Sequence, residues 1–307
     1  MTKKNCSIDI GTNSVRFLVT ELKNDRLIIL DKGGRITRLG EGVSGTGNLI
    51  PDASKRTLEY LRSLRNHILK FGEIHITVAA TEAVRIAKNA SPFLDETGKI
   101  LETTPKILSA AEEAYLSFLG ASDCMEKSDK TLFFDLGGGS TELIGVSAGT
   151  VKWNKSLKIG SVTAFEDFLK SDPPSPNEMN ALKKHSIKVF KSSLLKSWQP
   201  DSVIGIAGTV TTLAAISLGL KQYNSDKVHK HVITITELKS IFERLSGITA
   251  NERRNIPGVP PGREDIIVTG CLITLELLKL SNAKKFIVSD RGLLYGLAKE
   301  AFSSNSF

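Results

Sequence analysis

Two stretches of the sequence decide the fold: SIDIGTNSVRFLV at residues 7–19 and TLFFDLGGGSTELIGV at residues 131–146. Each is typical of an apolar strand that ends in Asp and one more apolar residue, followed by a glycine turn and a second strand. The stretches align at one constant offset, and the matched pairs are Asp9 with Asp135, Gly11 with Gly137, and Ser14 with Ser140. This repeat predicts two related domains, each opening with a hairpin of the phosphate-binding type.

Glycine turns between strands let backbone N–H groups approach an anion that a Cβ atom would hold away. In the second stretch, we predict that Gly137, Gly138 and Gly139 cradle a phosphate group. Asp135 and Glu142 flank these glycines and offer the hard oxygen ligands that Mg²⁺ prefers. A single turn of this kind is equally well explained by turn geometry, but two matched copies favour a function.

The rest of the chain alternates between helices and strands, which indicates an α/β fold. Three helix-start signals of the form Ser/Thr-x-x-Glu begin at Ser109, Ser175 and Thr249. Apolar spacing predicts strands over 74–80, 202–207 and 285–289, and helices over 52–71, 83–89, 109–119, 175–196, 209–218, 266–280 and 292–301.

The helix predicted from residue 109 begins with two adjacent glutamates that have different expected roles. Glu112 occupies the third helical position, where its carboxylate reaches back to the N-terminus at Ser109. Glu113 lies about 100° further around the helix, so its carboxylate can serve another role. A carboxylate at a helix N-terminus tends to stay ionised and can act as a base. From these residues alone, two capping or solvated glutamates are the simpler interpretation.

Composition narrows the possible functions. A hydrophobic content of 40% and a charged content of 24% are those of a folded globular protein. We expect a cytoplasmic protein with no membrane partner, because no apolar run approaches the roughly 20 residues that span a bilayer and no signal segment opens the chain. The net charge of +8 favours a polyanionic partner. An aromatic content of 6% gives little support for stacking on nucleic acid, so neither DNA nor RNA is expected.

The cysteines and histidines form no recognisable metal motif. Cys6, Cys124 and Cys271 are far apart in sequence and are expected to be buried thiols in a reducing compartment. His229 and His231 could bind a metal as a pair, but an incidental pair is the simpler interpretation.

Five motifs follow one another along the chain: IDIGTNS at 8–14, ATEAVR at 80–85, LSAAEEA at 108–114, FDLGGGSTE at 134–142 and AGTVTTLA at 207–214. Similarity continues through GRED at 262–265 and VSDRG at 288–292. In this order the motifs resemble the exopolyphosphatase / guanosine pentaphosphate phosphohydrolase family in its short, two-domain form. The resemblance covers nearly the whole chain.

The resemblance implies an actin-like, sugar-kinase-like fold, in which two ribonuclease-H-like domains face a cleft. The first domain is expected over residues 1–122 and the second over 123–291, with a helix near 292–307 that packs back on the first. It also implies Mg²⁺ as the cofactor.

The resemblance assigns roles to individual residues. Glu113 matches the catalytic base, Arg85 a phosphate-contacting arginine, and Asp135 and Glu142 the magnesium-linked carboxylates. The two phosphate loops correspond to Gly11, Thr12, Asn13 and Ser14, and to Gly137, Gly138, Gly139, Ser140 and Thr141.

Three further residues are candidates for binding the substrate anion. Arg38 could reach the anion, and a surface salt bridge is an equal alternative. Gly208 and Thr209 open a helix whose N-terminus could bind an anion, with a purely structural turn as the alternative.

The sequence departs from the family pattern at two positions. Ala110 stands where the family has Gly before the paired acids, which removes close backbone access to a ligand. Glu82 stands where the family has Ser, which adds a negative charge near Arg85. Both changes bear on the choice of substrate.

The leading hypothesis is an exopolyphosphatase that releases terminal orthophosphate from inorganic polyphosphate by Mg²⁺-assisted attack of a water activated by Glu113. A guanosine pentaphosphate 5'-phosphohydrolase of the stringent response is the close alternative. A sugar-type kinase and a non-catalytic sensor of guanosine polyphosphates are further alternatives. A homodimer is left open.

Overall fold

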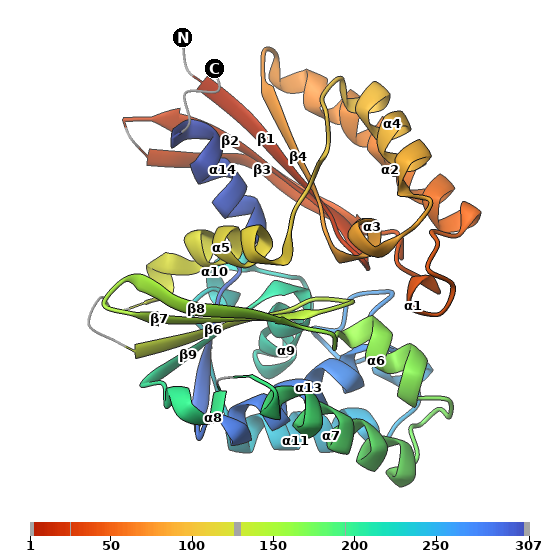
Figure 1. The fold of residues 1–307 in the computed structure, drawn as a ribbon, viewed down its shortest axis with the longest axis vertical. Helices are drawn as coiled ribbons and strands as arrows, with labels where there is room; N and C mark the ends of the chain where they lie inside the picture. Colours follow the sequence, from red (N-terminus) through yellow and green to blue (C-terminus); the bar gives the residue numbers. More distant parts are fainter. Residues whose placement is uncertain (1–2, 25, 126–129, 194, 304–307) are drawn as a thin grey trace. The chain divides into compact units, whose positions relative to one another are not determined.

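The computed structural model describes residues 3–24, 26–125, 130–193 and 195–303 (Figure 1). The predicted α/β class is confirmed, because the chain forms two mixed sheets with helices packed on them. Clustering of contacts divides the chain into two compact units. The first comprises Met1–Gly120 and Gly292–Phe307, and the second comprises Ala121–Arg291.

The first unit contains a five-stranded sheet in the order β3-β2-β1-β4-β5. The strands β1, β2 and β3 form an antiparallel meander, whereas β4 runs parallel to β1 and β5 runs parallel to β4. Their bounds are β1 Lys3–Ile10, β2 Ser14–Lys23, β3 Arg26–Ile36, β4 His75–Ala80 and β5 Lys106–Ile107.

Helices cover both faces of this sheet. Figure 1 shows α2 and α4 side by side on one face, where Ile8 and Ile10 of β1 lie in the same core as Leu61 and Phe93. On the other face, Leu18 contributes to a cluster with residues of α14. The helices of this unit are α1 Val43–Thr46, α2 Pro51–Ile68, η1 Leu69–Phe71, α3 Glu82–Ile86, α4 Ala90–Leu101, α5 Ala110–Ala121 and α14 Leu293–Ser303.

The C-terminal helix α14 packs against α5 at very short range. A Cβ atom on Gly296 would lie 2.0 Å from the carbonyl oxygen of Leu116, and one on Gly120 would lie 2.0 Å from that of Gly292. Leu293 and Leu297 of α14 share a buried cluster with Ala79, Leu108 and Leu116. The end of the chain therefore completes the core beneath α5, the helix that carries Glu113.

The second unit contains a six-stranded sheet in the order β10-β11-β9-β6-β7-β8. Here β6, β7 and β8 form the antiparallel meander, β9 and β11 continue in parallel, and β10 closes the edge antiparallel to β11. The strands are β6 Lys130–Leu136, β7 Thr141–Ser147, β8 Thr150–Leu157, β9 Ser202–Ile206, β10 Val232–Thr234 and β11 Lys285–Val288.

A large core joins the second sheet to its helices, and Phe134, Val210 and Leu275 are among its fully buried members. The helices of this unit are η2 Ser122–Cys124, α6 Ser161–Phe168, α7 Pro176–Lys191, α8 Leu195–Trp198, α9 Ala207–Ser217, α10 Ser225–Val228, α11 Ile235–Ser246, α12 Ala250–Arg253 and α13 Ile267–Leu280.

The sheets show the internal repeat that the sequence predicted. Read from the meander outwards, both sheets have the same order of strands and the same directions, and β10 is an addition to the second. This arrangement is the ribonuclease-H-like pattern expected from the resemblance.

The structure differs from the prediction in where one helix ends, and it contains several elements that were not predicted. The helix predicted to reach residue 196 ends at Lys191, because the hydroxyls of Ser192 and Ser193 donate to the carbonyls of Val189 and Phe190. The elements β3, β8, α4, α6 and α11 were not predicted. Among the described residues, no helix combines the length and the apolar character needed to cross a membrane.

Candidate functional site

The predicted site residues fall into two groups, one in each unit. In the first unit, the turn between β1 and β2 is closed by a hydrogen bond from the N–H of Gly11 to the carbonyl of Ser14, at 3.0 Å. The carbonyls of Thr12 and Asn13 are occupied, since they accept from Gly40 and from Thr37 and Arg38. Within the described residues, no backbone carbonyl accepts from the N–H groups of Thr12 and Asn13.

The first loop also carries a buried side-chain donor. The Nδ2 atom of Asn13 has no hydrogen-bond partner among the described residues, although Asn13 is only 8% exposed. A buried donor without a partner costs free energy, typically about 1–3 kcal/mol, unless a ligand or water satisfies it. The backbone and side chain of this loop therefore offer hydrogen-bond donors to an anion.

The turn between β6 and β7 repeats this geometry in the second unit. The N–H of Gly137 donates to the carbonyl of Ser140, again at 3.0 Å. The carbonyls of Gly137 and Gly138 accept N–H groups from the start of α6, at 2.9–3.1 Å. In the described part of the chain, no backbone carbonyl accepts from the N–H groups of Gly138, Gly139 and Ser140. Both loops thus turn their carbonyls inward and leave N–H groups for an anion.

The hydroxyls of the second loop already have partners. Ser140 donates to a carboxylate oxygen of Glu142 at 2.8 Å, and Thr141 donates to the carbonyl of Ile159 at 2.5 Å. The loop can therefore contact a phosphate group through its backbone while these two side chains fix its shape.

Asp135 and Glu142 lie directly opposite each other on β6 and β7, so their side chains share one face of the sheet. Glu142 is 1% exposed, and its Oε1 atom accepts hydroxyls from both Ser140 and Ser156, at 2.8 Å each. Two carboxylates on one face repel each other unless a cation lies near them. Their oxygen-only donor set fits Mg²⁺, which prefers carboxylate and water ligands.

Arg85 and Glu113 are in direct contact in the first unit. The Nη1 atom of Arg85 donates to Glu113 Oε2 at 3.0 Å and to the carbonyl of Leu108 at 2.7 Å. Its Nη2 atom is paired with Glu82. The side chains of Arg85, Glu82 and Glu113 are only 20%, 16% and 13% exposed.

One guanidinium is therefore shared between two carboxylates. Burial lowers the pKa of Arg85, but the hydrogen bond and charge of Glu113, followed by those of Glu82, raise its pKa overall. The pair holds the Glu113 carboxylate in one orientation. Glu82, the departure from the family pattern, occupies the other edge of the guanidinium.

Glu112 has the capping role that the sequence predicted. Its carboxylate accepts from the N–H of Ser109 at 2.9 Å, and its own N–H donates to the Ser109 hydroxyl at 3.2 Å. The hydrogen bond from Lys106 and those from Ser109 lower the pKa of Glu112 to about 2. The two adjacent glutamates thus have separate partners, Lys106 and Ser109 for one and Arg85 for the other.

The remaining candidates lie at backbone turns. Arg38 has a positive φ of 52°, and its N–H contacts the first loop through the carbonyl of Asn13. Gly208 is in the first turn of α9, after Ala207 with a φ of 75°. A Cβ atom on Gly208 would lie 2.1 Å from the guanidinium of Arg263, so a larger residue there would displace the Arg263 side chain.

Three residues near these sites were not singled out from the sequence. Ser156 supports Glu142 from β8, Arg263 packs on Gly208, and Gly160 lets α6 approach the second loop. A Cβ atom on Gly160 would lie 2.2–2.5 Å from the peptide between Gly138 and Gly139. Only Arg263 had a signal in the sequence, within the GRED motif.

The two glycine hairpins, the facing carboxylates and the arginine-held glutamate suit the binding of phosphate groups. Comparison with known proteins is more specific. Residues 18–303 match the Ppx/GppA phosphatase family, and the chain belongs to this family.

Individual relatives support the assignment. Exopolyphosphatase 2 of Mycobacterium tuberculosis is 29% identical over 313 residues, covering 95% of this chain and 96% of that protein. A guanosine-5'-triphosphate,3'-diphosphate pyrophosphatase of Aliivibrio fischeri is 25% identical, covering 98% of this chain but 60% of that protein. The crystal structure of the Aquifex aeolicus family member superposes with a TM-score of 0.82 at 32% identity and covers 99% of both chains. Family membership makes the protein a phosphoanhydride hydrolase.

Proposed function

We propose that this protein is an exopolyphosphatase, which hydrolyses the terminal phosphoanhydride bond of inorganic polyphosphate and releases orthophosphate. The observation that carries the proposal is the Glu113 carboxylate, which is only 13% exposed and is held by Arg85 at 3.0 Å. A carboxylate that merely capped its helix would resemble Glu112, which contacts Ser109 and Lys106 instead.

In the proposed reaction, Glu113 orients a water molecule and accepts its proton. The water oxygen bonds to the terminal phosphorus while the bond from phosphorus to the bridging oxygen breaks. The electron pair of that bond leaves on the chain, which is one phosphate shorter. Arg85 orients Glu113 before the substrate binds, and then shares its guanidinium with the phosphoryl oxygens.

The backbone N–H groups of the two hairpin loops bind phosphoryl oxygens in this proposal, and Asn13 adds its side-chain amide. Asp135 and Glu142 would hold Mg²⁺, which would supply neutralisation of the charge on the phosphoryl oxygens. In this class of reaction, positioning and charge neutralisation account for most of the acceleration.

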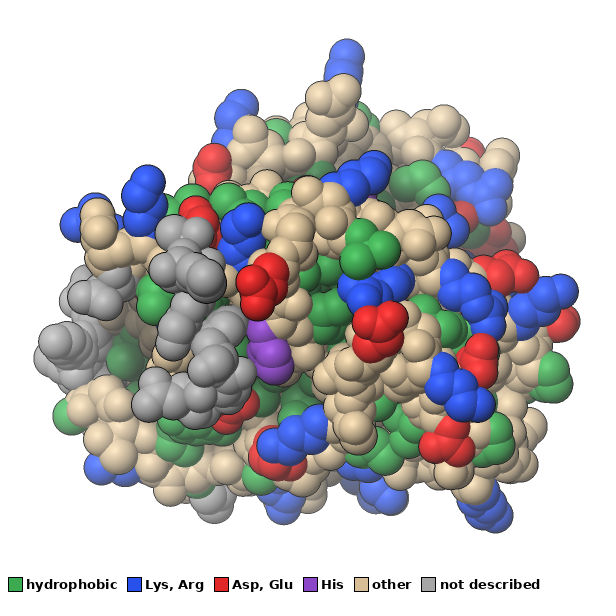
Figure 2. All heavy atoms as spheres, turned by 90° about the horizontal axis from the view of Figure 1, so that it is seen from above, with side chains coloured by type: hydrophobic (Ala, Val, Ile, Leu, Met, Phe, Trp, Pro, Cys, Tyr) green, Lys and Arg blue, Asp and Glu red, His purple; other side chains and the backbone are tan. Residues whose placement is uncertain are grey.

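Polyphosphate is preferred as the substrate because a relative that matches over 96% of its length is an exopolyphosphatase, and because the net charge is +8. Charge alone does not distinguish the substrates. On the face drawn in Figure 2, the described Lys and Arg side chains are interspersed with Asp and Glu and form no single basic stripe.

Guanosine pentaphosphate is the second candidate substrate. It is favoured by the similarity to the Aliivibrio fischeri pyrophosphatase and by the glycine-bearing start of α9, where Arg263 packs on Gly208. A helix N-terminus beside a guanidinium suits a second phosphorylated group on a nucleotide.

The test measures phosphate release with Mg²⁺ from long-chain polyphosphate, guanosine pentaphosphate and ATP in parallel. We expect Glu113→Gln to lower turnover on the preferred substrate by about 10²–10⁴-fold while substrate binding is retained. Glu112→Gln is the matched control and should change turnover little. Binding without phosphate release in the wild type would instead support a non-catalytic sensor, and equal activity of Glu113→Gln would remove this residue from the mechanism.

A further inference from the structure

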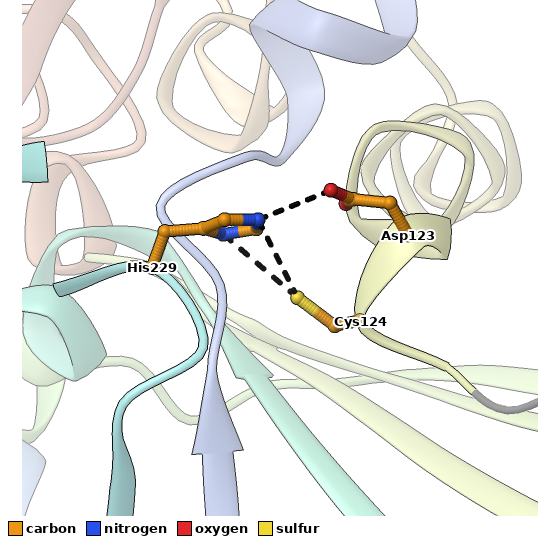
Figure 3. A group of neighbouring side chains, drawn as sticks. All are labelled: Asp123, Cys124 and His229. Carbon is orange, nitrogen blue, oxygen red and sulfur yellow. Dashed lines mark hydrogen bonds and ion pairs between the residues drawn. The ribbon is translucent and has the colours of Figure 1, made fainter. Parts of the chain in front are cut away.

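A second group of chemically reactive side chains lies in the second unit and contains none of the site residues discussed above. Asp123 and Cys124 belong to the short helix η2, and His229 directly follows α10. Figure 3 shows that the Cys124 sulfur and the Asp123 carboxylate both point toward the imidazole ring of His229. Their ligand atoms all lie within 4.8 Å of one another.

This finding corrects the expectation from the sequence that all three cysteines are buried. Cys6 and Cys271 are fully buried thiols, but Cys124 is partly exposed. His229 does not pair with His231, whose Nε2 atom contacts the hydroxyl of Ser217 at 2.8 Å. Instead, the fold brings His229 to a cysteine 105 positions earlier in the chain.

The distances suit a single metal ion. His229 Nε2 lies 3.1 Å from Asp123 Oδ2 and 4.0 Å from Cys124 Sγ. Tetrahedral Zn²⁺, with bonds of about 2.0–2.3 Å, separates its ligand atoms by roughly 3.3–3.7 Å. The two separations from His229 are therefore within about half an ångström of those of a bound ion.

The donor types select the kind of metal. One imidazole nitrogen, one sulfur and one carboxylate oxygen form a set that Zn²⁺ and similar transition metals accept, whereas Mg²⁺ takes oxygen alone. The set also differs from Asp135 and Glu142, which provide only oxygen. Three protein ligands leave one position for water or another ligand, as in open zinc sites.

Positively charged side chains around Asp123 compete with a metal ion for its carboxylate. Arg291 Nη1 lies 2.7 Å from Asp123 Oδ2, and Lys230 Nζ lies 3.9 Å from it. Burial lowers the pKa of His229, but hydrogen bonds to Asp123 and Cys124 raise it to about 9. An incoming metal ion must therefore release a proton and displace Arg291 from one oxygen. The side chains of Asp123 and His229 are 33% and 12% exposed, so an ion can reach them from solvent.

We propose that Asp123, Cys124 and His229 bind a transition-metal ion of the Zn²⁺ class at a site separate from the magnesium carboxylates. The second unit begins at Ala121 and ends at Arg291. A metal bound here would link Asp123 and Cys124, close to the start of this unit, to the loop at His229. Asp123 also contacts Arg291, the last residue of the unit. Such a site suits regulation by metal availability more than the hydrolytic step.

The test uses the full chain after chelation, with Co²⁺ as the probe, because a Co²⁺–thiolate bond absorbs in the near ultraviolet and tetrahedral Co²⁺ absorbs in the visible. We expect one Co²⁺ per chain with both bands, displaced by one equivalent of Zn²⁺. Cys124→Ser should abolish the thiolate band, and His229→Gln should weaken binding at least tenfold. The matched controls Cys271→Ser and His231→Gln should keep the wild-type spectrum.

A second measurement needs no variant. Zn²⁺ should protect Cys124 of the wild type from alkylation, as identified by peptide mass, while labelling of Cys6 and Cys271 stays low with or without metal because both are buried. The proposal is overturned if the wild type gives no thiolate band, if Cys124→Ser binds Co²⁺ as tightly with the same spectrum, or if Zn²⁺ leaves the alkylation of Cys124 unchanged. In those cases the cluster is an ion-pair network only.

Discussion

The two hairpins of the molecule share a backbone and differ in their side chains. In both, an N–H to carbonyl bond of 3.0 Å closes the turn, at Gly11 and at Gly137. In both, a later segment of the chain binds the loop carbonyls. The residues that face each other across the hairpins differ, however. Asp9 on β1 faces Arg16 on β2, whereas Asp135 on β6 faces Glu142 on β7. The internal repeat keeps the backbone of the turn and changes the charge beside it.

The third strand of each meander extends this difference. Gly34 lies opposite Arg16, and a Cβ atom there would lie 2.6 Å from the carbonyl of Val15. Ser156 lies opposite Glu142 and donates to its carboxylate. In the first hairpin, the third strand leaves space beside the Arg16 side chain. In the second, it donates a hydrogen bond to the Glu142 carboxylate. We infer that the second hairpin alone is built to bind a metal ion.

Among the tests of this comparison, the largest effect is expected from neutralising Glu142, the residue that faces Asp135. Glu142→Gln removes half of the carboxylate pair, so we expect phosphate release to fall by on the order of 10²–10³-fold and to need more Mg²⁺. Arg16→Gln is the counterpart and should leave the Mg²⁺ concentration for half-maximal activity unchanged. Rates measured across a Mg²⁺ series test this, and an equal shift in both variants would break the comparison.

Adding one methyl group tests how firmly each loop is held. Gly160→Ala places a Cβ atom against the backbone of the second loop at 2.2–2.5 Å, whereas Gly40→Ala meets the Thr12 side chain. Overpacking against backbone typically costs about 1–3 kcal/mol. We expect Gly160→Ala to lower the free energy of unfolding by that amount and to impair activity more than Gly40→Ala. Gly45→Ala is the control, because nothing lies within 4 Å of its Cβ position. Denaturant titrations compare the three, and equal losses at 160 and 40 would contradict this account.

Removing the support of the carboxylate should have a smaller effect. Ser156→Ala deletes one of the two hydroxyls that orient Glu142, while Ser140 keeps the other. Loss of such a supporting group typically costs about 10–100-fold in metal affinity or activity, and we expect the low end, about tenfold in Mg²⁺ affinity. Turnover at saturating Mg²⁺ should recover. If it stays low, Ser156 acts through folding and not through the metal.

The smallest expected effect concerns the loops themselves. Asn13 matches Gly139 by position, so the first loop has a side-chain amide where the second has none. Asn13→Ala should raise the KM for the anionic substrate by a few-fold, in line with about 0.5–1.5 kcal/mol for one hydrogen bond. Stability should not fall, because Nδ2 has no partner among the described residues. A loss of stability with an unchanged KM would show that the amide is structural.

Much of this arrangement could be predicted from the sequence because it depends on local spacing. The Asp-x-Gly repeat predicted both hairpins, and the Ser109 to Glu112 spacing predicted the capping box, whereas the role of Glu113 came from the family resemblance alone. The third strands were not predicted. Ile28, Ile29 and Leu30 of β3 are all exposed, so the strand lacks the alternation that marks a half-buried one.

Other features depend on contacts between distant residues and leave no local pattern. Ser156 reaches Glu142 only because β8 pairs with β7, and Gly160 is informative only once the second loop lies against it. The ion pair between Arg85 and Glu113 joins residues from two motifs that the sequence presents separately. The group of Asp123, Cys124 and His229 is the extreme case, because 105 positions separate its cysteine from its histidine.

The return of the chain to the first unit also sets the order in which the protein can be completed during synthesis. Leu108 and Leu116 bury their side chains against Leu293 and Leu297, which leave the ribosome only after the whole second unit. At about 5–20 residues per second, that delay is roughly 10–30 s. The second unit is continuous in sequence and can fold within this interval. The helix that carries Glu113 therefore gains this support only after the second unit has been synthesised.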